Sequence, residues 1–143
     1  MSIDNFYPRT PYYFLSNFST SPFEFMGIEY QTVEHFYQAA KTITPEAAES
    51  IISASTAKEA KKLGKHVMIR TDWDDIKLGV MELALRLKFQ DDYLRKKLLD
   101  TGEEHLEEGN YWEDRFWGTV DNIGENHLGK LLMKLREEYG QEN

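Results

Sequence analysis

The chain has no cysteine among its 143 residues, which excludes disulfide bonds, thiolate nucleophiles and cysteine-ligated metal sites. Its four histidines are scattered, with no pair at the spacing of a helical zinc site, so the sequence predicts no metal. It also lacks an apolar run near the roughly 20 residues that a membrane helix needs. Its first residues show neither the basic start nor the apolar stretch of a signal peptide. We therefore expect a soluble, cytoplasmic protein with no membrane partner.

Positive charge is scarce as well. The sequence carries 17 Lys and Arg against 25 Asp and Glu, a net charge of −8. This balance argues against broad, sequence-independent binding to a phosphate backbone, although it leaves room for a local basic pocket. The phosphate loop, the dinucleotide-binding glycine pattern, the serine-hydrolase elbow and the HExxH zinc motif are all absent. The sequence therefore supports none of the four activities to which these motifs belong.

The apolar spacing, caps and turn residues predict an α+β fold, mainly helical, with a small N-terminal β-ribbon and short additional strands. The length fits one domain spanning residues 1–143, with no linker or repeat. The predicted helices cover residues 32–41, 45–52, 57–63, 74–89, 91–100 and 127–139, and the predicted strands cover 12–15, 23–25, 28–30 and 105–108.

The helix at 32–41, with the sequence TVEHFYQAAK, is the centre of the predicted fold. Its apolar residues share one face, and Glu34, Gln38 and Lys41 form a polar stripe along the edge of that face. Such a stripe is either a solvated edge or part of a polar ligand site. His35 points further from the apolar face and is interpreted as structural or solvated.

Lysines are concentrated in two places. Four lie between residues 58 and 65, where they form either a solvated helix face or one wall of an anion pocket. Lys77 and Lys88 project at nearly the same angle inside an otherwise apolar sector of the helix at 74–89. A lysine in such a sector either extends its ammonium group to water or meets an anion.

Three carboxylates, Glu34, Glu107 and Asp114, stand beside aromatic or apolar neighbours. A carboxylate in such surroundings can activate water or stabilise positive charge that develops on a sugar carbon. The segment NYWEDRFWG at 110–118 has no regular periodicity, and its tryptophans either cap the core or stack on a flat ligand. With lysines to hold phosphate, this combination suits cleavage of a glycosidic bond in a nucleotide, but spacing alone does not establish it.

Seven segments in order resemble the YbiA-like or NADAR domain family and cover nearly the whole chain. They are FLSNF (14–18), GIEYQTVEHFYQAAK (27–41), AKEAKKLG (57–64), DWDDIKLGVMELALRLKF (72–89), LLDTGEEHLEE (98–108), DRFWG (114–118) and GENHLGKLLMKLR (124–136). The resemblance implies an α+β, mainly helical single domain that acts on N-glycosidic bonds of ribose. Members are associated with phosphorylated aminopyrimidine intermediates of riboflavin synthesis or with ADP-ribose on modified guanine.

The resemblance also implies site residues by position. Asn17 and Phe18 match the family's SNF, Glu34 its TVEH acid, Trp73 and Lys77 its DW and following lysine, and Asp114 and Trp117 its DxxWG. The predicted catalytic carboxylates are Glu34 first and then Asp114 or Glu107, and the predicted substrate-binding residues are Asn17, Phe18, Gln38, Lys41, Trp73, Lys77, Lys88 and Trp117. The chain departs from the family after WG, where Thr119–Asp121 replaces a glycine-rich sequence and puts substrate identity in question.

The leading hypothesis is an N-glycosidase that needs no metal or redox cofactor. Its partner would be a small phosphorylated N-riboside or an ADP-ribosyl compound, including ADP-ribosylated nucleic acid. The alternative is a non-catalytic module that binds ADP-ribose or NAD-derived nucleotides in the same pocket. A third hypothesis is an interaction domain that uses the lysine-rich helix at 58–65. Oligomeric state stays open.

Overall fold

A computed structural model describes residues 2–142 of the chain. The chain divides into two compact units. The middle unit comprises Asn17–Lys88, and the terminal unit combines Met1–Ser16 with Phe89–Asn143. That the chain folds as one domain stays a prediction.

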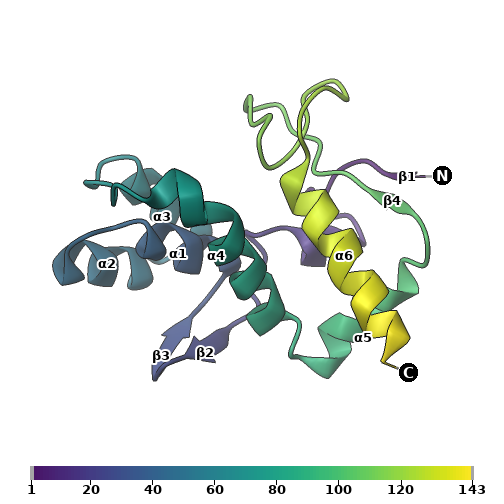
Figure 1. Ribbon diagram of the computed structural model, residues 1–143, viewed down its shortest axis with the longest axis horizontal. Helices are drawn as coiled ribbons and strands as arrows, with labels where there is room; N and C mark the ends of the chain where they lie inside the picture. The colour runs from purple at the N-terminus through teal and green to yellow at the C-terminus, as the bar shows by residue number, and fades with distance from the viewer. Residues whose placement is uncertain (1, 143) are drawn as a thin grey trace. The chain divides into compact units, whose positions relative to one another are not determined.

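The α+β, mainly helical fold class is confirmed (Figure 1). Within residues 2–142 the middle unit holds β2 (Phe23–Phe25), β3 (Ile28–Tyr30), α1 (Val33–Ala40), α2 (Pro45–Ile52), α3 (Ala57–Gly64) and α4 (Trp73–Lys88). The terminal unit holds β1 (Ser2–Ile3), a 3-10 helix η1 (Tyr13–Leu15), α5 (Asp92–Asp100), β4 (His105–Leu106) and α6 (His127–Gln141). None of the helices in the described part of the chain is long and apolar enough to cross a membrane.

The predicted strand at 12–15 is wrong, because the segment forms the 3-10 helix η1. Its backbone hydrogen bonds close three-residue turns, from Leu15 N to Tyr12 O at 3.0 Å and from Ser16 N to Tyr13 O at 2.9 Å. Phe14 and Leu15 are both buried, although neighbouring residues of a strand would point to opposite faces. The aromatic composition favours a strand, but the burial of adjacent side chains decides for a helical turn.

Strand β1 was not predicted from the sequence. It pairs in parallel with β4, with Ser2 opposite His105 and Ile3 opposite Leu106. Two residues are too few to show a period, and the partner lies about 100 positions away in the chain. Only the folded structure therefore shows this pairing.

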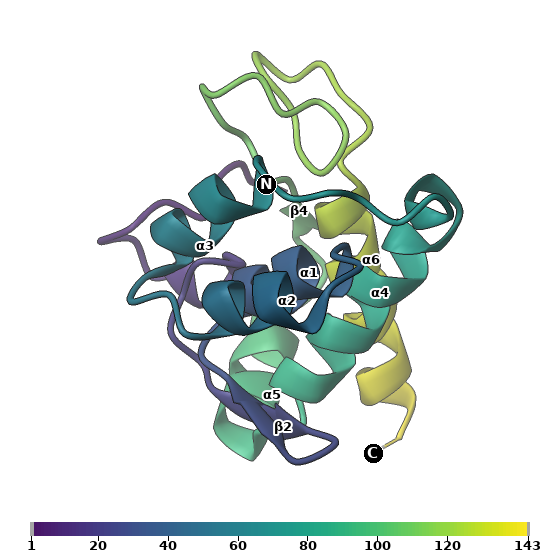
Figure 2. The same ribbon diagram turned by 90° about the vertical axis from the view of Figure 1, so that its left-hand side faces the viewer.

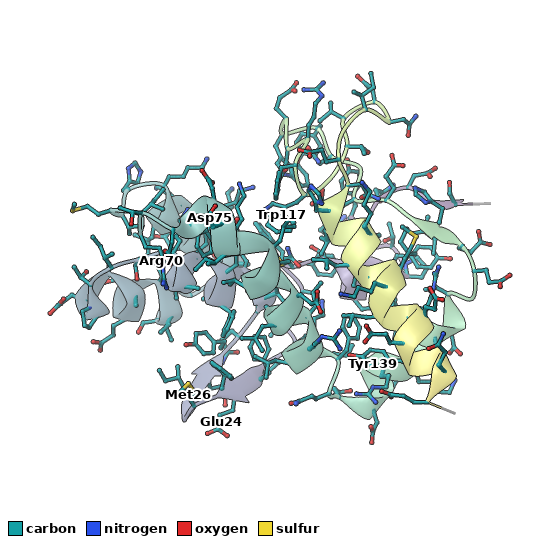
Figure 3. The ribbon with its side chains drawn as sticks, viewed as in Figure 1. Glu24, Met26, Arg70, Asp75, Trp117 and Tyr139 are labelled. Atoms are coloured by element: carbon teal, nitrogen blue, oxygen red, sulfur yellow. The ribbon has the colours of Figure 1, made fainter. Side chains whose placement is uncertain are left out.

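The predicted β-ribbon is confirmed as the hairpin of β2 and β3, with Phe25 opposite Ile28. Met26 and Gly27 connect the strands, and their φ angles are 52° and 82°. Two positive φ angles in a two-residue loop are typical of the type I′ turn that matches strand twist. Figure 3 shows Met26 at the tip of the hairpin, with Glu24 on the strand beside it.

Helix α1 packs against α2, α3 and α4 and is covered over most of its surface (Figure 2). Every residue from Val33 to Ala39 is buried. The helix begins at Thr32, whose hydroxyl oxygen accepts the backbone N–H of His35 at 3.1 Å. The His35 ring lies between two partners, with Nδ1 2.8 Å from Thr32 Oγ1 and Nε2 3.0 Å from the carbonyl oxygen of Ala54. His35 is therefore a buried structural residue.

The apolar spacing of helix α4 does not show which of its sides is buried. Its fully buried apolar residues are Met81, Ala84 and Leu85, whereas Leu78 and Leu83 are exposed. The apolar arc covers so much of this helix that spacing cannot select the buried side. The neighbouring elements make that selection.

Replacing Thr32 by alanine tests the cap of α1. Because Thr32 is 2% exposed and binds both the backbone and the ring of His35, we expect Thr32→Ala to lower the free energy of unfolding by about 2 kcal/mol. Thr44→Ala removes the matched but exposed cap of α2 and should lower it by about 1 kcal/mol. Urea unfolding of both variants measures the difference, and equal losses would contradict the role of the His35 ring contact.

Candidate active site

The polar stripe of α1 is buried rather than solvated. Glu34 is 7% exposed and Gln38 is 5% exposed, so the solvated-edge interpretation is wrong for these two residues. Gln38 Nε2 donates a hydrogen bond of 2.6 Å to Glu34 Oε2. A carboxylate can only accept, which fixes the amide with its nitrogen toward Glu34. The middle unit thus contains a buried acid with a directed partner on the same helix.

Asn17 lies at the N-terminal end of α1. Its carbonyl oxygen accepts the backbone N–H of Glu34 at 3.1 Å, which brings the SNF segment against the turn that carries the acid. Its side-chain Nδ2 lies 3.6 Å from the Met81 sulfur of α4. Asn17 Oδ1 is buried and has no hydrogen-bond partner among the described residues. Such an acceptor, which costs about 1–3 kcal/mol when left unpaired, suits a ligand that donates a hydrogen bond.

We call Lys41, Lys61 and Lys65 the lysine rim; Lys41 interacts with Glu34, Lys65 interacts with Lys41, and Lys61 lies over Phe18. Lys61 Nζ lies 5.8 Å from the centre of the Phe18 ring, which joins α3 to the SNF segment. Burial lowers the pKa of Lys41, the charge of Glu34 raises it, and the charge of Lys65 lowers it further. Positive charges therefore gather beside one buried carboxylate, an arrangement that attracts a phosphorylated ligand.

Trp73 and Lys77 lie on the first turns of α4. Trp73 is 7% exposed, and its ring centre lies 5.0 Å from that of Tyr37, so the indole packs on the core side of α1. Lys77 Nζ lies 3.3 Å from Asp74 Oδ1, one turn earlier on the same helix. The Asp74 side chain is 91% exposed, and an ion pair of this kind contributes little to stability. The substrate-binding roles of Trp73 and Lys77 stay predictions.

Lys88 ends α4 as a buried amine. It is 2% exposed, so it does not extend to water as one interpretation of the sequence allowed. Its Nζ donates to Ser19 Oγ at 3.3 Å, and Ser19 Oγ lies 3.4 Å from Ser21 Oγ. Burial lowers the pKa of Lys88 from 10.5 to about 7. At neutral pH this residue is a weaker fixed charge for phosphate than a solvated lysine.

Glu107 belongs to the terminal unit, where its carboxylate joins two segments of the chain. Oε2 accepts a hydrogen bond of 2.6 Å from the Thr119 hydroxyl, and Oε1 lies 3.2 Å from Nε2 of His105. The side chain is only 14% exposed. Both oxygens therefore hold structure around β4.

Asp114 organises the aperiodic loop before α6, also in the terminal unit. Its Oδ1 accepts the backbone N–H groups of Phe116 at 3.1 Å and Trp117 at 2.9 Å. Its own backbone N–H donates to Asn110 Oδ1 at 3.0 Å. Trp117 stands on this loop (Figure 3), half-buried, with its ring centre 4.8 Å from that of Phe116. Side-chain bonds to the backbone build this loop, which explains its lack of periodicity.

The middle unit and the terminal unit each contain a cavity, and the one in the middle unit is lined by the chain neighbours of Lys41 and Trp73. One of about 530 Å³ in the middle unit is lined by Thr42, Ile43 and residues 69–72. The other, of about 340 Å³, lies in the terminal unit beside Phe14 and Lys97. Neither lining includes a residue of the predicted site, and the chemistry of the buried acid weighs more than the size of a surface hollow.

Of the predicted site residues, the middle unit brings Asn17, Phe18, Glu34, Gln38 and Lys41 to α1 and the segments beside it. Site reasoning from the sequence did not include Lys61, Lys65, Met81 or Gly64 among the site residues. The lysine cluster at 58–65 was the available signal for the first two. Nothing in the sequence indicates that Gly64 lies close to Gln38.

Comparison with known proteins shows one family. The NADAR domain family matches residues 5–139. The N-glycosidase Npun_R5314 of Nostoc punctiforme is 42% identical over 135 residues, which cover 90% of this chain and 86% of that protein. The N-glycosidase YbiA of Escherichia coli is 37% identical over 145 residues, which cover 96% of this chain and 88% of that protein.

A solved structure and a longer relative add to this comparison. The NMR structure of Escherichia coli YbiA matches 99% of this chain and 86% of that chain, with a TM-score of 0.87 and 36% identity. The riboflavin biosynthesis protein VVA0006 of Vibrio vulnificus is 37% identical over 129 residues. Those residues cover 87% of this chain but 35% of that protein, so the similarity concerns one part of it.

Replacing Lys88 by methionine tests the lowered pKa of its buried amine. Between pH 7 and 10.5 the unfolded chain holds a proton that the native lysine has lost, so the stability of the wild type rises with pH in this window. Relative to Lys88→Met, we expect the free energy of unfolding to rise by about 1.4 kcal/mol per pH unit from pH 7 to 10. Below pH 7 both states are protonated and the difference should level off.

Denaturant unfolding of the two proteins across this pH range measures the effect. A constant difference between wild type and Lys88→Met from pH 6 to 10 would show that the native amine keeps its proton, contrary to this expectation.

Proposed function

Because the chain belongs to the NADAR domain family and is a hydrolase of N-glycosyl bonds, as its relatives named N-glycosidases are, we propose that Glu34 is the carboxylate that acts at the ribose carbon. The observation that carries the proposal is the burial of Glu34 on α1, with Gln38 bonded to it and the lysine rim beside it. A buried, oriented carboxylate next to half-buried and exposed lysines suits a phosphorylated sugar whose C1 must react.

The surroundings of the other two acids favour Glu34. The Glu107 oxygens bind Thr119 and His105, and Asp114 Oδ1 binds two backbone N–H groups. These bonds give both residues a structural role in the terminal unit. Glu34 instead lies on a helix with an acceptor of Asn17 still unpaired close by, so it combines an acid with capacity for a ligand.

The reaction needs no group beyond water and the chain's own residues. In the transition state the bond between ribose C1 and the base nitrogen breaks, and positive charge develops on C1 and the ring oxygen. The Glu34 carboxylate stabilises that charge and accepts a proton from the attacking water, whose oxygen forms the new bond to C1. The released nitrogen takes up a proton from solvent, Glu34 returns its proton to solvent, and the products are the free base and the sugar with a hydroxyl at C1.

The remaining residues of the middle unit bind and orient the substrate in this proposal. Phe18 offers a flat face for the base, and Asn17 Oδ1 accepts a hydrogen bond from an amino or hydroxyl group. The lysine rim binds phosphate. Trp73 and Lys77 extend the site along α4.

We propose a phosphorylated aminopyrimidine riboside as the substrate. The relatives in Vibrio vulnificus and Zea mays whose names refer to riboflavin biosynthesis support this choice over ADP-ribosylated guanine. The substrate amino groups would meet the unpaired oxygen of Asn17, and its phosphate would meet the lysine rim.

Replacing the acid by its amide tests the role of Glu34. We expect Glu34→Gln to lower kcat at least 100-fold with little change in the melting temperature, because an amide neither accepts the proton nor stabilises the positive charge. Glu24→Gln makes the same substitution on the exposed hairpin and serves as the matched control, with kcat unchanged. Full release of base by a folded Glu34→Gln variant would contradict the assignment.

Parallel assays identify the substrate. We expect mass spectrometry to detect ribose 5-phosphate from the phosphorylated aminopyrimidine riboside, and turnover to fall at least tenfold when the phosphate is removed. An arm with ADP-ribosylated guanine measures the competing activity. Faster release of ADP-ribose in that arm would overturn the substrate choice, and tight binding without release in every arm would support the non-catalytic alternative.

A further inference from the structure

The side-chain amide of Gln38 donates a hydrogen bond to the Glu34 carboxylate. Its Nε2 lies 2.6 Å from Glu34 Oε2, and the two residues stand one turn apart on α1. Both side chains are buried, at 5% and 7% exposure. A buried amide that donates to a carboxylate at this distance restricts the rotation of that carboxylate.

The oxygen of the Gln38 amide is held by packing and not by a hydrogen bond. Gln38 Oε1 is buried without a hydrogen-bond partner among the described residues, and it lies against Gly64 at the end of α3. A Cβ on Gly64 would stand 1.9 Å from Oε1 and 2.6 Å from Cδ of Gln38. Any side chain at position 64 would therefore push the amide away from its present place.

Position 64 requires a glycine because a side chain there would clash with Gln38, and not because the backbone conformation is unusual. Gly64 belongs to the regular helix α3, and its φ is not in the left-handed region. Turning the amide round would bring its oxygen against the Glu34 carboxylate, which is repulsive. The chain thus keeps an unpaired oxygen against Gly64 so that the nitrogen faces the acid.

We infer that Gln38 is a positioning residue that holds the Glu34 carboxylate for reaction, and that Gly64 provides the space in which it does so. This inference rests on the proposed catalytic role of Glu34. It changes the role of Gln38 from a substrate contact, as the sequence suggested, to an orienting partner of the acid. A carboxylate that rotates away from C1 binds substrate as before but reacts more slowly.

Two single substitutions and their combination test the inference. We expect Gln38→Ala and Gly64→Ala each to lower kcat at least tenfold while KM stays within about twofold, because orientation of the acid is lost and substrate contacts remain. The double variant should be no slower than Gln38→Ala alone, since the new methyl group then fills space that the amide has left.

Gly79→Ala is the matched control. Gly79 lies in α4, and a Cβ placed there meets nothing within 4 Å, so kcat should stay at the wild-type value. Melting temperatures confirm that each variant is folded. If Gly64→Ala does not fold, Gln38→Ala alone decides the question through kcat and KM.

Three results would overturn the inference. Unchanged kcat in folded Gln38→Ala would show that the acid needs no orienting amide. A rise in KM at constant kcat would make Gln38 a substrate contact. Additive losses in the double variant would separate Gly64 from Gln38. Failure of the proposed function is recognised separately, because Glu34→Gln would then keep its activity whatever the Gln38 variants do.

Discussion

The middle unit depends on a carboxylate, that of Glu34, which is buried on a helix that other helices cover. Removing Glu34 from water is unfavourable unless partners replace the solvent. Gln38 on the same helix supplies a hydrogen bond of 2.6 Å, and Lys41, the residue after the helix, supplies positive charge. Because α2, α3 and α4 cover α1, these partners also exclude water from the acid. The packing that stabilises the unit is therefore also what gives its carboxylate a defined chemical environment.

The rest of α1 is built to keep that carboxylate still. Thr32 caps the helix, and the His35 ring joins it to the carbonyl of Ala54 after α2. Asn17 accepts the backbone N–H of Glu34 itself, so the acid is anchored through both its backbone and its side chain. A site on a fixed helix holds its geometry better than one on a loop, which suits the catalytic role that we propose for Glu34.

Local signals explain which parts of this structure the sequence predicts. Threonine caps and apolar periods predict helices α1, α2 and α3, because both signals act within a few residues of the chain. The pairing of Ser2–Ile3 with β4 acts over about 100 residues, and the helical turn at Tyr13–Leu15 follows from burial that only tertiary packing decides. The burial of Glu34 is likewise decided by tertiary packing. A helical period gives the direction of a side chain but not its depth.

Lys77 and Lys88 illustrate this difference between direction and depth. They project at nearly the same angle from α4, yet Lys77 pairs with exposed Asp74 while Lys88 is 2% exposed beside Ser19. Burial lowers the pKa of Lys88 to about 7, so its charge changes near neutral pH. Within the lysine rim, Lys65 is exposed, whereas Lys41 and Lys61 are half-buried. The middle unit thus combines a buried carboxylate on a packed helix, which we propose as the catalytic acid, with a rim of half-buried and exposed lysines.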